Sequence, residues 1–192
     1  MKIGIFGGTF NPPHIGHLIA AEVLLSDMKL DKIIFIPSYI SPHKQLGEEE
    51  SATHRLEMVR RELSGNNHFE VSDFEIQQQE TSYTYKTLEY FSEKYLDAEL
   101  YLIIGMDNFA GFHTWKNPEK IVTLSSLIVI NRPDYPLPHQ QIVPDSKLHF
   151  VTIPDIGISS SLIRERVQHR QSIRYLVPDS VSEYIIKNKL YK

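Results

Sequence analysis

Short runs of apolar residues alternate along this chain with longer segments whose apolar residues recur every three or four positions. The runs are rich in isoleucine, valine, leucine and aromatic residues and show no polar alternation, which is typical of strands buried on both faces of a sheet. Such strands are expected at residues 3–6, 33–37, 100–104, 127–130 and 150–153, with a weaker one at 69–71.

Helical patterns lie between these runs. Segments 16–28, 53–63 and 84–95 each present one apolar face, and 178–188 is expected to form a last helix. Alternation of strands and helices predicts an α/β fold with a mostly parallel sheet and helices on both faces. Ligands of such sheets bind outside the carboxyl ends of the strands. We therefore expect the functional residues in the loops that follow strands.

The bulk composition limits the class of function. A length of 192 residues suits one domain, spanning 1–192, that is large enough to bury a sizeable core. The formal net charge of −4 argues against bulk binding of nucleic acid, for which a basic balance is expected. The absence of cysteine excludes a disulfide framework, a cysteine zinc site and a thiol nucleophile.

The sequence carries no recognisable targeting or membrane signal. The N-terminal apolar run is too short for a signal peptide. No stretch approaches the roughly 20 apolar residues of a membrane span. We therefore expect a soluble, cytoplasmic protein with neither a membrane nor a nucleic acid as partner.

The most informative segment, GGTFNPPHIGH at residues 7–17, lies between the first expected strand and the first expected helix. Gly7 and Gly8 permit a tight turn and close approach of a ligand to the backbone. A helix start offers free N–H groups and partial positive charge, which suit phosphate. His14 and His17 are three residues apart, so their rings project from nearly the same face of a helical turn. Both imidazoles can donate hydrogen bonds to phosphate oxygens during phosphoryl or nucleotidyl transfer.

Two plainer interpretations of this segment compete with a phosphate site. One treats the histidines as surface residues and the glycine pair as a simple turn, but the whole eleven-residue arrangement after a buried strand argues against it. The other is a metal site. Helical pairs of zinc ligands usually lie four residues apart with a nearby carboxylate, and neither feature is present.

A second candidate phosphate segment, ISSSLIRER at residues 158–166, follows the last expected strand. Ser159 and Ser160 suit the start of a helix, whose N–H groups they can cap. Arg164 then falls in the first turn, where a cation opposes the helix dipole unless an anion binds there. A solvent-facing arginine is the alternative. We assign Arg164 alone to the site and expect the other arginines of this region to lie on a solvated face.

These two segments resemble the paired signatures of one nucleotidyltransferase superfamily. Residues 7–17 are similar to GGxFxPxHxGH, found in nicotinate-nucleotide, pantetheine-phosphate and related adenylyltransferases. Residues 158–164 are similar to ISSTxIR, with Ser161 in place of threonine. The resemblance implies a Rossmann-like, doubly wound fold. It also implies that a substrate phosphate attacks the α-phosphorus of ATP and releases pyrophosphate, with His14 and His17 contacting the ATP phosphates.

Further matches favour the nicotinate-nucleotide branch. A stretch similar to PxxxPPHK ends in Lys44, whose charge can neutralise a phosphate. Residues 82–84 match an SYT segment at a helix start, which suits the carboxylate of nicotinate. Residues 103–107 match IIGxD, and Trp115, the only tryptophan, lies eight residues beyond Asp107, as in the family. There this indole is expected to stack on the pyridine ring; packing in the core is the alternative.

The resemblance implies one shared site for ATP and nicotinate mononucleotide. Mg²⁺ is expected to be carried by the ATP and pyrophosphate oxygens, because the sequence shows no dedicated carboxylate cage. No side chain need act as a nucleophile or base, and His14, His17, Lys44 and Arg164 are expected to stabilise charge. The implied substrate-binding residues are Gly7, Gly8, Thr9, Phe10, Tyr83, Thr84, Gly105, Asp107, Trp115, Ser159 and Ser160.

Departures from the family pattern and two alternatives remain. Gln78, Glu80, Thr81 and Lys86 replace residues that are usually Arg, Gly, Pro and Asp, so the contacts of that loop stay open. One alternative is adenylyl transfer to another phosphate such as phosphopantetheine; the other is a non-catalytic nucleotide-binding protein on the same scaffold. The SYT segment and Trp115 argue against the first, and retention of the positive residues argues against the second. The sequence leaves open the degree of preference for nicotinate over nicotinamide and whether the chain forms a homo-oligomer.

Overall fold

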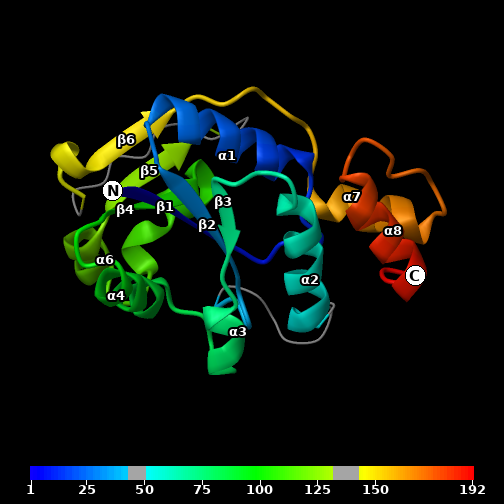
Figure 1. Cartoon of the computed structure of the whole chain (residues 1–192), viewed down its shortest axis with the longest axis horizontal. Helices are drawn as coiled ribbons and strands as arrows, with labels where there is room; N and C mark the ends of the chain where they lie inside the picture. Colours follow the sequence, from blue (N-terminus) through cyan, green and yellow to red (C-terminus); the bar gives the residue numbers. More distant parts are fainter. Residues whose placement is uncertain (43–50, 132–142) are drawn as a thin grey trace.

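The computed structural model of this protein describes residues 1–42, 51–131 and 143–192 (Figure 1). Within them one six-stranded sheet has the order β3-β2-β1-β4-β5-β6, and every pair of neighbours is parallel. The predicted α/β fold, a Rossmann-like, doubly wound sheet, is confirmed. The strands are β1 (Lys2–Gly8), β2 (Lys32–Pro37), β3 (Phe69–Val71), β4 (Glu99–Gly105), β5 (Ser126–Ile130) and β6 (Leu148–Val151).

Helices and short 3-10 turns connect these strands. The four helices predicted in full, α1, α2, α4 and α8, are confirmed with ends that differ by at most one residue. The sequence does not predict α3, α5 or α6, because five to seven residues complete at most about two turns and show no repeating apolar face. The elements are α1 (Ile15–Asp27), α2 (Ala52–Leu63), α3 (Phe74–Gln78), α4 (Thr84–Lys94), α5 (Met106–Ala110), η1 (Phe112–Thr114), α6 (Pro118–Leu124), η2 (Asp145–Lys147), α7 (Ser160–Gln168) and α8 (Asp179–Asn188).

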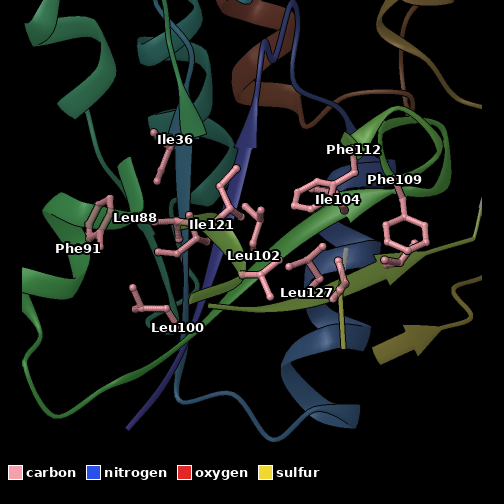
Figure 2. Packing of buried hydrophobic residues seen from close by; sticks show 14 of the residues in the cluster. Ile36, Leu88, Phe91, Leu100, Leu102, Ile104, Phe109, Phe112, Ile121 and Leu127 are labelled. Carbon is pink, nitrogen blue, oxygen red and sulfur yellow. The ribbon is translucent and has the colours of Figure 1, made fainter. Parts of the chain in front are cut away.

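Both faces of the sheet are covered, which explains the continuous apolar runs. In β2, Ile34 and Ile36 belong to the cluster that packs against α4, α5 and α6 (Figure 2). Ile33 and Phe35, which alternate with them, belong to the cluster that packs against α1 and α2. A strand between two layers of helices therefore has no position at which a polar side chain reaches water.

The edge strand β6 departs from the prediction. The run 150–153 was expected to be buried on both faces, but β6 ends at Val151 and pairs only with β5 among the described strands. Phe150 is 49% exposed, and its ring contacts that of Phe109 on one side only. The expectation of two-sided burial is wrong here, because an edge strand lacks the second neighbour. The acidic segment 46–51 and the proline-rich segment 132–144, whose composition predicts solvated loops, lie almost wholly outside the described residues.

A third hydrophobic cluster joins the C-terminal part of the chain to α2. Val181 and Ile185 of α8, Ile163 of α7 and Met58 of α2 are buried together. In Figure 1, α7 and α8 accordingly lie beyond α2, on the side of the molecule away from β6. This packing brings residues 158–166 next to the loop that follows β1.

Glu62 of α2 is a buried carboxyl with a thermodynamic consequence. It is 5% exposed, and neither carboxyl oxygen has a hydrogen-bond partner among the described residues. Burial raises the pKa of Glu62 well above its ordinary value, because the charged form loses its water. The folded protein therefore keeps a proton that the unfolded chain releases above about pH 4.3. This group makes the fold less stable as pH rises from there toward the raised pKa.

We expect Glu62→Met to stabilise the protein at and above neutral pH. The change removes an unsatisfied buried polar group, which is worth about 1–3 kcal/mol in the free energy of unfolding. The advantage over wild type should grow between about pH 5 and about pH 8, because only the wild type contains Glu62, whose contribution to stability falls as pH rises. Urea unfolding at both pH values measures the difference. A variant that is less stable than wild type at both values would contradict this account.

Candidate active site

The direction of strand order reverses between β1 and β4, which lie side by side at the centre of the sheet. Ligands of doubly wound sheets bind outside the carboxyl ends of the strands at this position. A cavity of about 890 Å³ lies there, inside the range of about 300–1,000 Å³ that holds small molecules. Gly7 and Gly8 at the end of β1 and Gly105 at the end of β4 form part of its wall.

The phosphate loop, as we call residues 7–14, has a strained backbone at Phe10. This residue has φ of +50°, a left-handed conformation that costs about 1–3 kcal/mol and persists where the surroundings over-determine it. Its ring is 3% exposed, packs against Phe6 and Phe35, and lies edge-on to the His17 ring with 5.0 Å between centroids. Phe10 therefore supports the imidazole from the core while part of its ring reaches the cavity wall.

The two imidazoles lie together at the start of α1. Their rings are stacked, with 3.7 Å between centroids and 23° between planes. The His14 backbone N–H donates to His17 Nδ1 at 3.1 Å, so the Nδ1 of His17 acts as an acceptor. In the neutral ring the proton then sits on Nε2, where it can be donated to a ligand. A side chain at Gly16 would place its Cβ 3.0 Å from His14 Nδ1, so the missing side chain leaves room for this arrangement.

The second predicted segment bonds directly to the phosphate loop. Ser159 caps α7 by accepting from the Leu162 N–H at 3.2 Å. The Ser160 hydroxyl donates to the Pro12 carbonyl at 2.7 Å. Arg164 donates from Nη1 to the Asn11 carbonyl at 2.8 Å. The guanidinium and the imidazole pair therefore meet at one cavity, from segments about 150 residues apart.

Two further contacts from the C-terminal region hold the phosphate loop. The Tyr191 hydroxyl donates to Asn11 Oδ1 at 2.7 Å in a buried position, and the Ile15 N–H donates to the Leu176 carbonyl at 3.1 Å. Sequence reasoning missed Tyr191, because a tyrosine 180 positions away carries no local sign of its partner. The phosphate loop and the start of α1 are thus held by groups of the C-terminal region.

The opposite part of the cavity is formed by α4 and η1. Tyr83 is the residue before α4 and Thr84 is its first, and both line the cavity at this helix start. Trp115 lines the cavity as well and packs against Phe112, with 5.5 Å between ring centroids. The indole therefore combines the two alternatives that the sequence left open, since one side contacts the core cluster and another borders the cavity.

Polar residues that sequence reasoning missed also border the cavity. Glu75 of α3 is partly buried, and this loss of water raises the pKa of its carboxyl. Asn131 follows β5, accepts from the Ile153 N–H at 2.6 Å and donates to the Ile153 carbonyl at 3.1 Å. It thus fixes the chain that leads from β6 toward α7. Neither residue belongs to a recognisable motif, so only the folded arrangement identifies it.

Several known proteins are similar in sequence to this chain over its whole length. Residues 5–166 match the Cytidylyltransferase-like family. The chain is 40% identical to a Bacillus licheniformis protein named probable nicotinate-nucleotide adenylyltransferase, over 100% of this chain and 98% of the relative. It is 42% identical to a protein of the same name from Desulfitobacterium hafniense, over 100% of this chain and 96% of the relative. The chain belongs to the nicotinate-nucleotide adenylyltransferase family.

Solved structures with low sequence identity share the fold of this adenylyltransferase. A Plasmodium falciparum nicotinic acid mononucleotide adenylyltransferase complexed with NaAD gives a TM-score of 0.83 at 22% identity, covering 99% of this chain and 97% of that one. The enzyme from the same organism complexed with APC gives 0.81 at 22% identity, covering 99% and 96%. The likeness extends over the α7–α8 region as well as the sheet.

Every predicted site residue of this adenylyltransferase except Lys44 lines the cavity. Lys44 lies outside the described residues; Ser41 and Pro42, just before it, line the cavity. The individual roles in binding and catalysis stay predictions. The residues brought together are Gly7, Gly8, Thr9, Phe10, His14, His17, Tyr83, Thr84, Gly105, Asp107, Trp115, Ser159, Ser160 and Arg164.

Arg166, Arg170 and Arg174 do not line this cavity in the described part of the chain. Arg166 donates from Nε to the Ser172 carbonyl at 2.7 Å, within the C-terminal region. Arg170 and Arg174 are exposed. Only Arg164 of this arginine group is therefore directed at the phosphate loop.

Two of the residues that depart from the family pattern near the SYT segment, residues 82–84, form an ion pair. Lys86 donates to Glu80 at 2.8 Å, an exposed pair. This hydrogen bond lowers the pKa of the Glu80 carboxyl and raises the pKa of Lys86. Thr81 forms a bridge to Ile40 in the segment after β2. Two of the four departures therefore form an ion pair near the start of α4, and a third contacts the segment after β2.

No group of three or more His, Asp or Glu side chains in the described ranges is placed to hold a metal ion. Within the same ranges, no helix has the length and apolar character needed to cross a membrane.

Proposed function

We propose that this chain transfers the adenylyl group of ATP to nicotinate mononucleotide, forming deamido-NAD and releasing pyrophosphate. The convergence of the imidazole pair and the Arg164 guanidinium on one cavity at the switch point carries the proposal. Membership of the nicotinate-nucleotide adenylyltransferase family supports the same reaction.

The chemistry needs no protein nucleophile. An oxygen of the mononucleotide phosphate forms a bond to the α-phosphorus of ATP, and the bond from that phosphorus to the oxygen bridging the β-phosphate breaks. The bonding pair leaves with pyrophosphate. The attacking phosphate is already ionised at neutral pH, so no side chain has to remove a proton. Rate enhancement comes from holding both substrates in line and from stabilising the charge on the departing group.

The protein supplies positive potential on the side of the phosphate loop. His17 donates from Nε2, since its Nδ1 already accepts from the His14 N–H. Arg164 supplies a permanent charge, and its guanidinium can bind phosphate oxygens through more than one N–H. The start of α1 adds a partial positive charge. We assign to Lys44 the role of supplying a further positive charge next to the pyrophosphate.

The nicotinate end of the mononucleotide fits the opposite part of the cavity. The start of α4, lined by Tyr83 and Thr84, offers backbone N–H groups to the nicotinate carboxylate. Trp115 offers an aromatic face to the pyridine ring. Mg²⁺ would be carried by the substrate phosphates and not by a dedicated protein site, and it would supply charge neutralisation there. A cytoplasmic location, a single domain and the oligomeric state stay predictions or open questions.

Pyrophosphate release measured with three acceptors tests the proposal. The purified chain is incubated with Mg-ATP and nicotinate mononucleotide, nicotinamide mononucleotide or phosphopantetheine. We expect the highest kcat/KM with nicotinate mononucleotide and stoichiometric formation of deamido-NAD. A higher kcat/KM with phosphopantetheine would replace the proposed acceptor. Absence of pyrophosphate with all three, from a folded chain that binds ATP, would make the protein a nucleotide binder.

Trp115→Ala should separate the two substrates kinetically. Loss of stacking on one ring costs about 1–3 kcal/mol, so we expect KM for nicotinate mononucleotide to rise roughly 10-fold. KM for ATP should stay within about twofold, because the proposed contact of the indole is with the pyridine ring and not with ATP. Trp115→Phe is the matched control and should recover most of the loss. Equal increases in both Michaelis constants would indicate that the indole acts by supporting Phe112 and the core.

A further inference from the structure

The buried Arg55 of α2 joins two walls of the cavity. Its side chain is 2% exposed. Nη1 donates to the Thr9 carbonyl at 2.8 Å, and Nη2 donates to the Tyr39 carbonyl at 3.0 Å. Thr9 belongs to the phosphate loop and Tyr39 to the segment after β2. A planar guanidinium holds two carbonyls at a fixed separation, whereas an ammonium group is a single point on a flexible stem.

The segment after β2 is bonded in turn to the SYT segment. The Tyr39 N–H donates to Ser82 Oγ at 2.9 Å, and the Ser82 N–H donates to the Ile40 carbonyl at 2.9 Å. On the other side, the Ser38 N–H donates to the Gly8 carbonyl at 2.9 Å. A continuous hydrogen-bonded framework therefore runs from the phosphate loop, through the segment after β2, to the start of α4.

Glu75 supports this framework and interacts electrostatically with Arg55. Thr87 Oγ1 donates to Glu75 Oε1 at 2.6 Å, and Ser82 also donates to the carboxylate. Burial raises the pKa of Glu75, while these hydrogen bonds and the positive charge of Arg55 oppose the rise. A buried arginine near a partly buried carboxyl offsets part of the cost of removing each from water. The two charged groups thus come from α2 and α3 and act on one framework.

We infer that Arg55 is a positioning residue that couples the two substrate subsites. It fixes the phosphate loop, which takes ATP, relative to the SYT segment, which takes the nicotinate end of the acceptor. The identity of the two substrates rests on the proposed function. Arg55 is absent from the cavity wall as far as the described residues define it. It therefore acts through Thr9 and Tyr39 and does not touch substrate.

A fixed separation between subsites has a recognisable signature. A ligand that spans both subsites gains from their fixed relation, because binding its first half places the second at high effective concentration. Separate ligands for each subsite gain nothing from it. In-line attack is sensitive in the same way, since a displacement of about 1 Å can cost about 10²-fold in rate. Loss of coupling should therefore lower kcat and weaken the spanning product more than either substrate.

The test compares Arg55→Met, Arg55→Lys and Glu75→Gln with the wild-type chain and with Arg60→Met. Arg60 lies on the same helix, is half exposed and pairs with Asp73 at 3.5 Å, so it controls for loss of an arginine from α2. Calorimetry measures binding of ATP, nicotinate mononucleotide and deamido-NAD separately, and pyrophosphate release gives kcat. For Arg55→Met we expect kcat to fall about 10²-fold. The affinity for deamido-NAD should fall at least about 10-fold, while the affinities for ATP and for nicotinate mononucleotide should stay within about threefold of wild type. Arg55→Lys should recover part of both losses.

Failure of this inference differs from failure of the proposed function. A wild-type chain that forms no deamido-NAD from nicotinate mononucleotide refutes the proposed function. Suppose instead that the wild type is active and the Arg55 variant is folded. A normal kcat in that variant, or an equal loss of affinity for all three ligands, refutes only the coupling. If Arg55→Met does not fold, Arg55→Lys and Glu75→Gln decide. Both variants must lose more affinity for deamido-NAD than for ATP for the inference to stand.

Discussion

The His17→Ala variant is expected to turn over at about one-hundredth of the wild-type rate or less, the scale of removing one donor to charge that develops in a transition state. The His14 N–H occupies Nδ1 of the ring, which leaves Nε2 as the donor. The hydrogen bond that Nε2 is expected to donate to the pyrophosphate oxygens strengthens as negative charge builds on this departing group. We therefore expect kcat to fall more than KM for ATP rises. Pyrophosphate release at saturating substrates measures kcat directly.

Replacement by asparagine separates catalysis from loop structure. The amide oxygen of His17→Asn can accept from the His14 N–H much as Nδ1 does, but no donor remains at the position of Nε2. We expect this variant to melt near the wild-type temperature and to lose as much turnover as the alanine variant. His169→Ala, at an exposed end of α7, serves as control and should keep its activity. A folded His17→Asn enzyme with near-normal turnover would remove this imidazole from the mechanism.

The architecture could be predicted because its strongest signals are local. A strand between two helical layers must be apolar at every position, and β2 shows this in four consecutive residues that alternate between two clusters. The same reasoning fails for β6, where Phe150 is half exposed at the sheet edge. An apolar run reports β-propensity, but it does not report how many neighbours the strand has.

The imidazole half of the site was also predictable from the sequence, because the phosphate loop is contiguous. His14 and His17 are three residues apart, and this spacing already predicts that their rings share one face of the helical turn, as the stacked rings do. Residues that act across the fold leave no such mark. Arg55 lies in the helix ATHRLEMVRREL, which has five charged residues when His is counted as neutral, so its pattern is that of an ordinary surface arginine. Its burial follows from the packing of α2 against the phosphate loop.

The convergence of the two segments was implied by family resemblance, and the structure supplies its physical cause. Ile163 and Met58 are buried in one cluster, which holds α7 beside α2. From there Ser160 reaches the Pro12 carbonyl and Arg164 reaches the Asn11 carbonyl. A separation of about 150 residues in the sequence does not by itself predict either of these two hydrogen bonds. Packing of an apolar cluster, and not the polar motif itself, brings the guanidinium to the imidazoles.

Arg164→Ala is expected to lower kcat/KM for ATP about 100-fold, because it removes a permanent charge from the phosphate side of the cavity. Arg164→Lys should lose less, since it keeps the charge but not the planar fork that binds phosphate oxygens in pairs. Arg166→Ala is the matched control on the same helix, with its side chain directed to Ser172. Pyrophosphate release over a range of ATP concentrations gives the ratio for each variant.

Arg164 could instead act only by holding the phosphate loop through the Asn11 carbonyl. The Ser160→Ala variant distinguishes this role from a direct effect of the Arg164 charge. Ser160 holds the neighbouring Pro12 carbonyl at 2.7 Å, so its loss loosens the same loop without changing the charge of the site. If Arg164 acts through its charge on the triphosphate, Ser160→Ala should cost no more than about 10-fold, as expected for one neutral hydrogen bond of about 1 kcal/mol. Comparable losses in Ser160→Ala and Arg164→Ala would show instead that catalysis depends on the position of the phosphate loop, with the guanidinium serving only to hold it.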